Sequence, residues 1–173
     1  MLIIQLTGLS GSGKTTLSHH VKHLLEQQNL RAEIIDGDTY RKTLCSDLGF
    51  SREDRRENIR RLGRLAASFK DRDVVIIAAI NPFEEVRNEL KLTYGVKTVW
   101  INCAIDVLIN RDTKGLYKRA LLPDNHPDKL YNLTGINDDY DLPLDYDLVI
   151  NTHSALIEQS GKLLFNFIVA NIN

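Results

Sequence analysis

The stretch Leu2-Ile3-Ile4-Gln5-Leu6-Thr7-Gly8-Leu9-Ser10-Gly11-Ser12-Gly13-Lys14-Thr15 decides the fold of this chain. It joins an apolar run to a glycine-rich loop of the form GxxxxGK[ST], and residues with helical spacing follow. This order predicts a strand, a phosphate-binding loop and a helix. The glycines let successive backbone N–H groups converge on an anion, and the helix turns its positive end toward the same charge.

The loop is therefore expected to bind a nucleoside triphosphate. The residues expected to contact it are Gly8, Leu9, Ser10, Gly11, Ser12, Gly13, Lys14, Thr15 and Thr16. Lys14 should reach the β- and γ-phosphates and take part in catalysis, and the Thr15 hydroxyl should hold Mg²⁺. The alternative is that an ordinary turn matches the loop motif by chance. A chance match would not need an apolar strand before the motif and a helix after it.

Length and composition limit the class of protein. The chain has 173 residues and a net charge of -1, and its length predicts a single domain over residues 1–173. Cys45 and Cys103 are far apart and outside any CxxC spacing, which favours a reducing, cytoplasmic compartment. No apolar stretch approaches the roughly 20 residues that span a bilayer. The balanced charge provides no field for nucleic acid or anionic membrane, so we expect a soluble protein with neither as a partner.

Five apolar, β-branched runs alternate with segments that can hold helices, which predicts an α/β fold with a five-stranded parallel sheet sandwiched by helices. The runs are 2–6, 32–35, 74–80, 96–101 and 148–150. The third run is apolar throughout, so we expect it to be a central strand buried on both faces. We expect helices at about 15–29, 52–70, 83–94, 105–111 and 154–170, to within about three residues.

Residues 113–144, which we call the lid segment, interrupt this alternation. The lid segment is polar, holds three of the four prolines and shows neither sustained alternation nor a long amphipathic stripe. A connection of this length inside a domain is usually functional or disordered, and phosphotransferases close flaps over their substrates. We expect a mobile lid, with a flexible surface insertion as the alternative.

Two carboxylates, Asp36 and Asp38, directly follow the second predicted strand. Ligands bind at the carboxyl edge of open α/β sheets, so both side chains should face the same crevice as the loop. A small-molecule kinase needs one carboxylate that orients or deprotonates the attacking hydroxyl and another that anchors the Mg²⁺ water shell. Asp36 and Asp38 fit these two catalytic needs, while an Asp-Gly turn is the structural alternative.

The predicted helix at 52–70 carries six arginines within thirteen residues: Arg52, Arg55, Arg56, Arg60, Arg61 and Arg64. Glu53 and Glu57 can pair with arginines three or four positions away, so a solvated, salt-bridged face is expected for most of them. Arginine also binds phosphate and sulfate with two parallel hydrogen bonds. We expect one or two of the six to be functional, and the spacing does not say which.

Four motifs together resemble those of the adenylyl-sulfate kinases, and the resemblance covers essentially the whole chain. They are the GLSGSGKTT loop, Asp36-Gly37-Asp38 with Arg41, the stretch 47–61 with its DRRENIRR sequence, and Arg111-Asp112-Thr113-Lys114-Gly115-Leu116-Tyr117-Lys118. The resemblance implies a P-loop NTPase fold like that of the nucleoside-monophosphate kinases. It implies transfer of the γ-phosphate of ATP, the co-substrate, to the 3′-hydroxyl of adenylyl sulfate, which gives 3′-phosphoadenylyl sulfate. Mg²⁺ is the implied cofactor and a homodimer the implied assembly.

The resemblance also implies roles for single residues. Asp38 would meet the 3′-hydroxyl, and Asp36 would support the Mg²⁺ site with Thr15. Phe50 would stack on the acceptor base, and Arg111 would lie on the ATP adenine. The residues that would bind the acceptor or close over its phosphates are Asp38, Arg41, Phe50, Arg55, Asn58, Ile80, Asn81, Lys114, Lys118 and Leu133.

Three positions depart from the family pattern. The family's Ser-Pro-Phe or Ser-Pro-Tyr followed by Arg appears here as Asn81-Pro82-Phe83-Glu84, and the phenylalanine of Phe-Thr-Gly-Ile is Leu133. Glu84 would reverse an anion contact if it faced the acceptor, and Leu133 would remove one face of an aromatic sandwich around the base. A kinase of a similar acceptor, cytidine diphosphoramidate, is therefore an alternative. A non-catalytic nucleotide switch is a second alternative, although the Asp-x-x-Gly and Asn-Lys-x-Asp motifs of guanine switches are absent.

Overall fold

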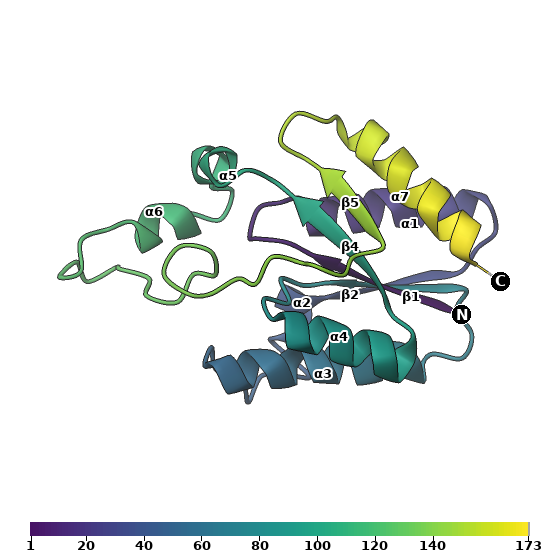
Figure 1. Cartoon of the computed structure of the whole chain (residues 1–173), viewed down its shortest axis with the longest axis horizontal. Helices are drawn as coiled ribbons and strands as arrows, with labels where there is room; N and C mark the ends of the chain where they lie inside the picture. The colour runs from purple at the N-terminus through teal and green to yellow at the C-terminus, as the bar shows by residue number, and fades with distance from the viewer. Residues whose placement is uncertain (173) are drawn as a thin grey trace.

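A five-stranded parallel sheet with helices on both faces forms the body of the protein (Figure 1). The computed structural model describes residues 1–172. The strands are β1 (Leu2–Thr7), β2 (Ala32–Asp36), β3 (Val74–Ala78), β4 (Lys97–Asn102) and β5 (Leu148–Asn151). They lie in the order β2-β3-β1-β4-β5, and every neighbouring pair is parallel. The predicted α/β fold is confirmed, with β1 at the centre and the apolar third run as an interior strand between β1 and β2.

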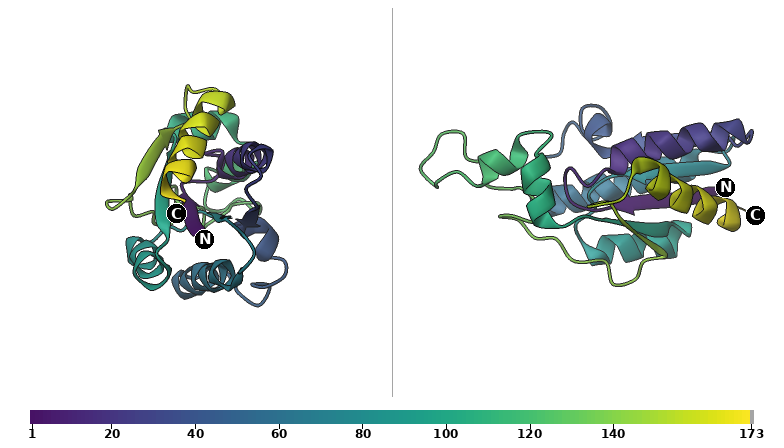
Figure 2. Two further views of the ribbon diagram at one scale, coloured as in Figure 1. Left: turned by 90° about the vertical axis from the view of Figure 1, so that its right-hand side faces the viewer. Right: turned by 90° about the horizontal axis from the view of Figure 1, so that it is seen from above.

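Two helix layers cover the sheet, and the alternation of strand side chains divides the core between them. The helices are α1 (Lys14–Gln27), α2 (Gly37–Tyr40), α3 (Arg52–Ser68), α4 (Glu84–Tyr94), α5 (Ile105–Arg111), α6 (Leu116–Ala120) and α7 (Ile157–Asn171). Ile3 and Ile77 belong to the core under α3 and α4, whereas Ile4 and Ile76 belong to the core under α1 and α7. Figure 2 shows these two layers on opposite sides of the sheet. Because both faces are buried, the interior strands need the continuous apolar runs seen in the sequence.

Helix ends follow local signals that the sequence carries. The Ser51 side chain caps α3 by accepting a hydrogen bond from Asp54 N at 3.1 Å, and Gly95 ends α4 with a φ of 66°. Each of the five predicted helices lies within three residues of an observed one. The two helices that the sequence did not predict, α2 and α6, have four and five residues. Helices this short carry no amphipathic stripe that periodicity could detect.

The lid segment projects from the carboxyl edge of the sheet, where it forms the green extension of Figure 1. It holds α6 and a small hydrophobic core of its own, in which Tyr117, Ala120 and Leu133 pack against Leu108 of α5. Its last part returns along the sheet, where Asp141 N donates to Pro82 O at 2.8 Å. The lid segment is therefore packed against the body of the protein at both ends in this structure.

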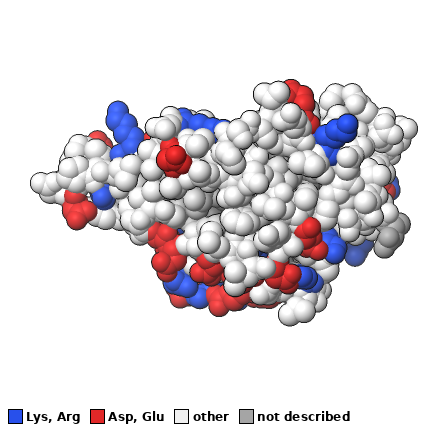
Figure 3. All heavy atoms as spheres, turned by 45° about the horizontal axis from the view of Figure 1, so that its top comes forward, with Lys and Arg blue, Asp and Glu red and all other residues white. Residues whose placement is uncertain are grey.

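Acidic and basic side chains lie side by side on the face shown in Figure 3. On α3 and α4 they form pairs such as Arg60 with Glu89 at 2.8 Å. Within residues 1–172, we find no helix that is both long and apolar enough to cross a membrane.

Candidate active site

The loop between β1 and α1 presents backbone N–H groups to a cleft. Gly8 has a φ of 152°, and a Cβ there would lie 2.4 Å from a backbone oxygen of β4, so only glycine fits. Gly13 has a φ of 98° and directly precedes α1. Within residues 1–172, the N–H groups of Gly11, Gly13, Lys14 and Thr15 have no acceptor. Free N–H groups at the positive end of a helix can bind an anion, so this geometry is compatible with the phosphate site that the sequence predicts.

Lys14, the first residue of α1, curls back over this loop. Its Nζ donates to Gly8 O at 2.7 Å and to Leu9 O at 2.8 Å, and the residue is 9% exposed. Burial lowers the pKa of Lys14 to about 7, and the positive charge of Lys114 acts in the same direction. Asp38 and Asp36 oppose this shift. A polyphosphate in the cleft would restore the charged ammonium form.

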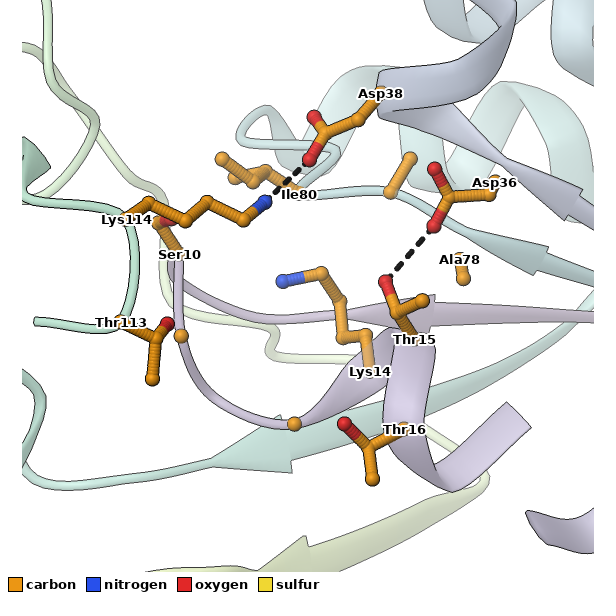
Figure 4. A pocket seen from close by; sticks show the side chains of 13 residues that line it. Ser10, Lys14, Thr15, Thr16, Asp36, Asp38, Ala78, Ile80, Thr113 and Lys114 are labelled. Atoms are coloured by element: carbon orange, nitrogen blue, oxygen red, sulfur yellow. Dashed lines mark hydrogen bonds and ion pairs between the residues drawn. The ribbon is translucent and has the colours of Figure 1, made fainter. Parts of the chain in front are cut away.

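Thr15 and Asp36 meet across the floor of the cleft, where the Thr15 hydroxyl donates to Asp36 Oδ2 at 2.8 Å (Figure 4). Asp36 also caps α2, because its Oδ1 accepts from Thr39 N at 3.0 Å. Partial burial opposes ionisation of this carboxyl, but the hydrogen bonds from Thr15 and Thr39 outweigh burial and lower the pKa of Asp36. Asp36 is thus ionised beside the hydroxyl predicted to hold a metal ion.

The loop, the two aspartates and the lid segment enclose a cleft of about 170 Å³. Its lining residues are Ser10, Gly11, Gly13, Lys14, Thr15, Thr16, Asp36, Asp38, Ala78, Ala79, Ile80, Thr113 and Lys114. Lys114 reaches in from the lid segment and forms an ion pair with Asp38 of α2, while Lys14 lies below them (Figure 4). The structure therefore brings Asp36, Asp38 and the predicted triphosphate site together in one cleft.

A second cavity of about 290 Å³ adjoins the first and shares Asp38, Ala79 and Ile80 with it. Its lining residues are Gly37, Asp38, Arg41, Lys42, Phe50, Arg55, Asn58, Ile59, Ala79, Ile80, Asn81 and Pro82. Seven of these are among the ten residues that the sequence assigned to the acceptor: Asp38, Arg41, Phe50, Arg55, Asn58, Ile80 and Asn81. We call this cavity the acceptor pocket.

The acceptor pocket combines one aromatic ring with two guanidinium groups. The Cζ atoms of Arg41 and Arg55 lie 4.8 and 5.5 Å from the ring centroid of Phe50, which is 57% exposed. Burial lowers the pKa of Arg41 and of Arg55. Within residues 1–172, the Oδ1 atoms of Asn58 and Asn81 are buried without a hydrogen-bond partner. Buried polar atoms of this kind are usually satisfied by a ligand or by water.

Arg55 links the acceptor pocket to the lid segment. Its Nη2 donates to Asn132 O at 2.6 Å and pairs with Asp138 Oδ2 at 2.8 Å, and its Nη1 donates to Thr134 Oγ1 at 3.0 Å. The side chain of Arg55 is 9% exposed. Of the six α3 arginines, it alone lines the acceptor pocket. The others pair with carboxylates, as expected for a salt-bridged face: Arg52 with Asp139, Arg56 with Glu85, Arg60 with Glu89, Arg61 with Asp47 and Arg64 with Glu57.

Glu84 does not line the acceptor pocket, so the expected reversal of an anion contact does not occur in this structure. Its carboxylate instead pairs with Arg87 of α4 at 2.7 Å. Arg87 is 1% exposed and also donates to Asn81 O at 2.7 Å and to Asp141 O at 2.6 Å. Glu84 thus neutralises buried Arg87. The hydrogen bonds of Arg87 in turn hold Asn81 in the acceptor pocket and Asp141 in the last part of the lid segment.

Six predicted site residues line neither cavity: Gly8, Leu9, Ser12, Arg111, Lys118 and Leu133. The first three belong to the loop itself, where the Gly8 and Leu9 carbonyls accept from Lys14 Nζ. Arg111 Nη2 donates to the carbonyl oxygens of Thr152 and His153 at 2.9 and 3.1 Å. Leu133 is 4% exposed in the small core of the lid segment. Lys118 is exposed in the middle of α6.

Sequence reasoning missed several lining residues. Thr113 follows from its position beside Lys114 in the recognised motif, and Ala79 from its place at the carboxyl edge of the sheet. Lys42 and Ile59 lack such a signal, because only the packing of the segment that follows α2 against α3 brings them to the acceptor pocket.

The donors that the sequence assigns to Mg²⁺ are the Thr15 hydroxyl and the Asp36 carboxylate, which meet in the cleft. Within residues 1–172 no group of three or more His, Cys, Asp or Glu side chains could hold a metal ion. Mg²⁺ commonly binds through one or two carboxylates together with substrate phosphates and water. Thr15 and Asp36 fit that pattern, in which the nucleotide supplies the remaining oxygens.

Comparisons with known proteins identify the same family that the sequence motifs resemble. The family model described as adenylylsulphate kinase matches residues 1–151. An adenylyl-sulfate kinase of Geotalea daltonii is 39% identical over 171 residues, which cover 96% of this chain and 82% of that protein. An adenylyl-sulfate kinase of Chloroflexus aurantiacus is 42% identical over 153 residues, which cover 87% of this chain and 80% of that protein.

A solved structure is similar over almost the whole chain. It is the Mycobacterium tuberculosis APS kinase in complex with AMPPNP and APS, which superposes with a TM-score of 0.85 at 30% sequence identity. The match covers 98% of both chains.

Proposed function

The chain belongs to the adenylylsulphate kinase family, and from this premise we propose that it transfers the γ-phosphate of ATP to the 3′-hydroxyl of adenylyl sulfate. The product is 3′-phosphoadenylyl sulfate. The observation that carries the proposal is the junction of the two cavities at Asp38, because the cleft at the loop suits a triphosphate and the acceptor pocket suits a nucleotide. Phosphoryl transfer depends mainly on such positioning and on charge neutralisation.

On the donor side, the free N–H groups of the loop bind the phosphates, and Lys14 leaves the loop carbonyls to reach the γ-phosphate. Mg²⁺, when bound with the nucleotide, neutralises phosphate charge, and Thr15 and Asp36 are the residues that would hold it. Arg111 is the residue proposed to lie on the adenine. Its guanidinium is anchored by the carbonyls of Thr152 and His153 beside the loop.

On the acceptor side, Asp38 orients the 3′-hydroxyl and accepts its proton. Phe50 stacks on the base, while Arg41 and Asn58 bind the anionic part of the molecule. Asp38 must first leave the ion pair with Lys114. The freed ammonium of Lys114 then lies at the junction of the two cavities, where charge moves during transfer.

The lid segment is proposed to close over both ligands. Arg55 ties residues 132–138 to the acceptor pocket, and Lys114 ties the start of the lid segment to Asp38. Lys118, which is exposed here, would reach phosphate only if α6 moved. Leu133 would likewise contact the acceptor base only if it moved, because it would have to leave the small core of the lid segment.

A second acceptor, cytidine diphosphoramidate, is favoured by one observation. Asn81 replaces the family serine, and its buried Oδ1 has no partner within residues 1–172. A sulfate offers only acceptor oxygens, whereas the amino group of a phosphoramidate would donate to such an oxygen. Steady-state assays with both acceptors discriminate between them: saturation by the cytidine compound at low concentration, with no turnover of adenylyl sulfate, would replace the first proposal by the second.

We also propose a cytoplasmic homodimer. The two cysteines are buried and unbonded, which suits a reducing compartment. Leu142 and Leu144 at the end of the lid segment and Tyr146 just after it are exposed and supply apolar surface for a second copy. Light scattering after size-exclusion chromatography tests the assembly, and a monomeric mass at micromolar concentration would refute it.

A further inference from the structure

Two hydroxyl groups from distant parts of the chain hold carbonyl groups of the phosphate-binding loop. The hydroxyl of Tyr117, on α6 of the lid segment, donates to Ser10 O at 2.8 Å. The hydroxyl of Thr152, directly after β5, donates to Ser12 O at 2.9 Å. Neither residue lines the cleft, so neither is placed to touch the nucleotide.

A carbonyl held in this way also fixes the next N–H group. In a trans peptide the C=O of one residue and the N–H of the next point in opposite directions, and residues 1–172 contain no cis peptide. Tyr117 therefore directs the N–H of Gly11 away from α6, and Thr152 directs the N–H of Gly13 away from β5. Gly11 and Gly13 line the cleft, and both N–H groups lack an acceptor within the described residues.

The glycines make this external support necessary. Gly11 and Gly13 have φ values of 76° and 98°, in a region that glycine enters and leaves at little cost. The glycines themselves therefore offer little resistance to a flip of the peptides that precede them, and such a flip would turn a carbonyl oxygen toward the phosphates. We propose that Tyr117 and Thr152 are positioning residues for the donor, which hold the Ser10–Gly11 and Ser12–Gly13 peptides with their N–H groups toward the anion.

Tyr117 is suited to this role by its surroundings. It is 1% exposed and packs with Leu108 and Leu133, so its ring is fixed by the small core of the lid segment. Burial raises the pKa of Tyr117 to about 12, which keeps the hydroxyl a donor at any physiological pH. The inference rests on the ATP-binding part of the proposed function alone and does not depend on the acceptor.

The test compares Tyr117→Phe and Thr152→Val with Tyr131→Phe, a lid tyrosine whose hydroxyl donates to Asp124 O away from both cavities. Calorimetry without acceptor gives the Kd of MgATP, of MgADP and of AMP, which lacks the β- and γ-phosphates. We expect Tyr117→Phe and Thr152→Val each to raise the Kd of MgATP and MgADP roughly five- to fifty-fold, as expected when a buried carbonyl loses its donor. AMP binding and all three Kd values of Tyr131→Phe should change less than two-fold.

Two outcomes would overturn the inference. One is an unchanged Kd of MgATP in both test variants, and the other is an equal loss for AMP and MgATP, which would indicate a general structural role. Because Thr152 lies outside the lid segment, its variant gives an answer even if Tyr117→Phe unfolds α6. Failure of turnover with adenylyl sulfate would refute the proposed function and leave these binding results intact.

Discussion

Lys114 of the lid segment and Asp38 of α2 form an ion pair at the junction of the two cavities, facing Lys14. The pair places the proposed base and the Lys114 ammonium at the point where a phosphoryl group would pass between donor and acceptor. Their side chains are 74% exposed for Asp38 and 50% exposed for Lys114, so water and ligands can replace the contact. The ion pair therefore contributes little to folding, and we propose that its role is functional.

Lys114→Gln should lower kcat by roughly ten- to hundred-fold, because it removes a positive charge from the site of charge transfer. The free energy of unfolding should change by less than about 1 kcal/mol, as expected for an exposed pair. Steady-state kinetics and urea denaturation measure the two effects. Lys129→Gln, on the lid segment but outside both cavities, is the matched control. An unchanged kcat in Lys114→Gln would refute the assigned role.

Asp38→Asn should reduce kcat by about 100-fold or more and leave the Kd of MgATP nearly unchanged. The substitution keeps the size of the side chain but removes the acceptor for the proton of the attacking hydroxyl. Single-turnover kinetics and calorimetry separate the two quantities. Equal losses in both would mean that Asp38 binds ATP and would leave the acceptor without its proposed base.

Nucleotide binding should take up a proton above neutral pH. The pKa of Lys14 is lowered to about 7 in the ligand-free protein, so at pH 8 most of its side chain is neutral. Phosphate favours the charged form and raises this pKa, so up to about one proton should enter with MgATP, and affinity should weaken as pH rises through 7 to 9.

Calorimetry at pH 8 in buffers of different ionisation enthalpy measures this uptake. Lys14→Arg stays charged over the whole range and should show no proton uptake from this position. Equal uptake in the wild type and in Lys14→Arg would assign the proton to another group.

For Leu133→Phe, the structure predicts a loss of lid stability, whereas the family pattern predicts tighter binding of the acceptor. From the family pattern alone, a phenylalanine would restore an aromatic face and strengthen binding of adenylyl sulfate. In the structure Leu133 is 4% exposed beside Leu108 and Tyr117, so a larger ring should overpack that core and destabilise the lid segment by about 1 to 3 kcal/mol. Hydrogen exchange of residues 113–144 and the acceptor Kd test this, and tighter acceptor binding without faster exchange would show that Leu133 reaches the base.

The sequence predicts the fold and the presence of Lys14 and Thr15 in the cleft, because both depend on short-range signals. Apolar runs define the five strands, and the loop motif alone places Lys14 and Thr15 at the carboxyl edge of β1. The same edge rule brings Asp36 and Asp38 into the cleft. These inferences need only chain order and the geometry of parallel strands.

The rest depends on tertiary packing that no spacing encodes. The short helices α2 and α6 have no amphipathic period. Glu84 and Arg87 are three positions apart on α4, a spacing that allows a pair, but the burial of Arg87 against Asp141 O depends on how α4 meets the end of the lid segment. The contacts of Tyr117 and Thr152 with the loop join residues 107 and 140 positions apart. Such contacts become visible only when the lid segment and β5 are placed beside the loop.

The most direct test of the account is phosphoryl transfer itself. The wild-type protein, incubated with Mg²⁺, γ-labelled ATP and adenylyl sulfate, should form labelled 3′-phosphoadenylyl sulfate, and the 3′-deoxy acceptor should receive no label. Lys14→Ala should abolish nearly all of this transfer while retaining the fold. Label that appears on the 3′-deoxy acceptor, or ATP that binds without transfer to adenylyl sulfate at any concentration, would contradict the claim that the two cavities meet at Asp38 to phosphorylate a 3′-hydroxyl.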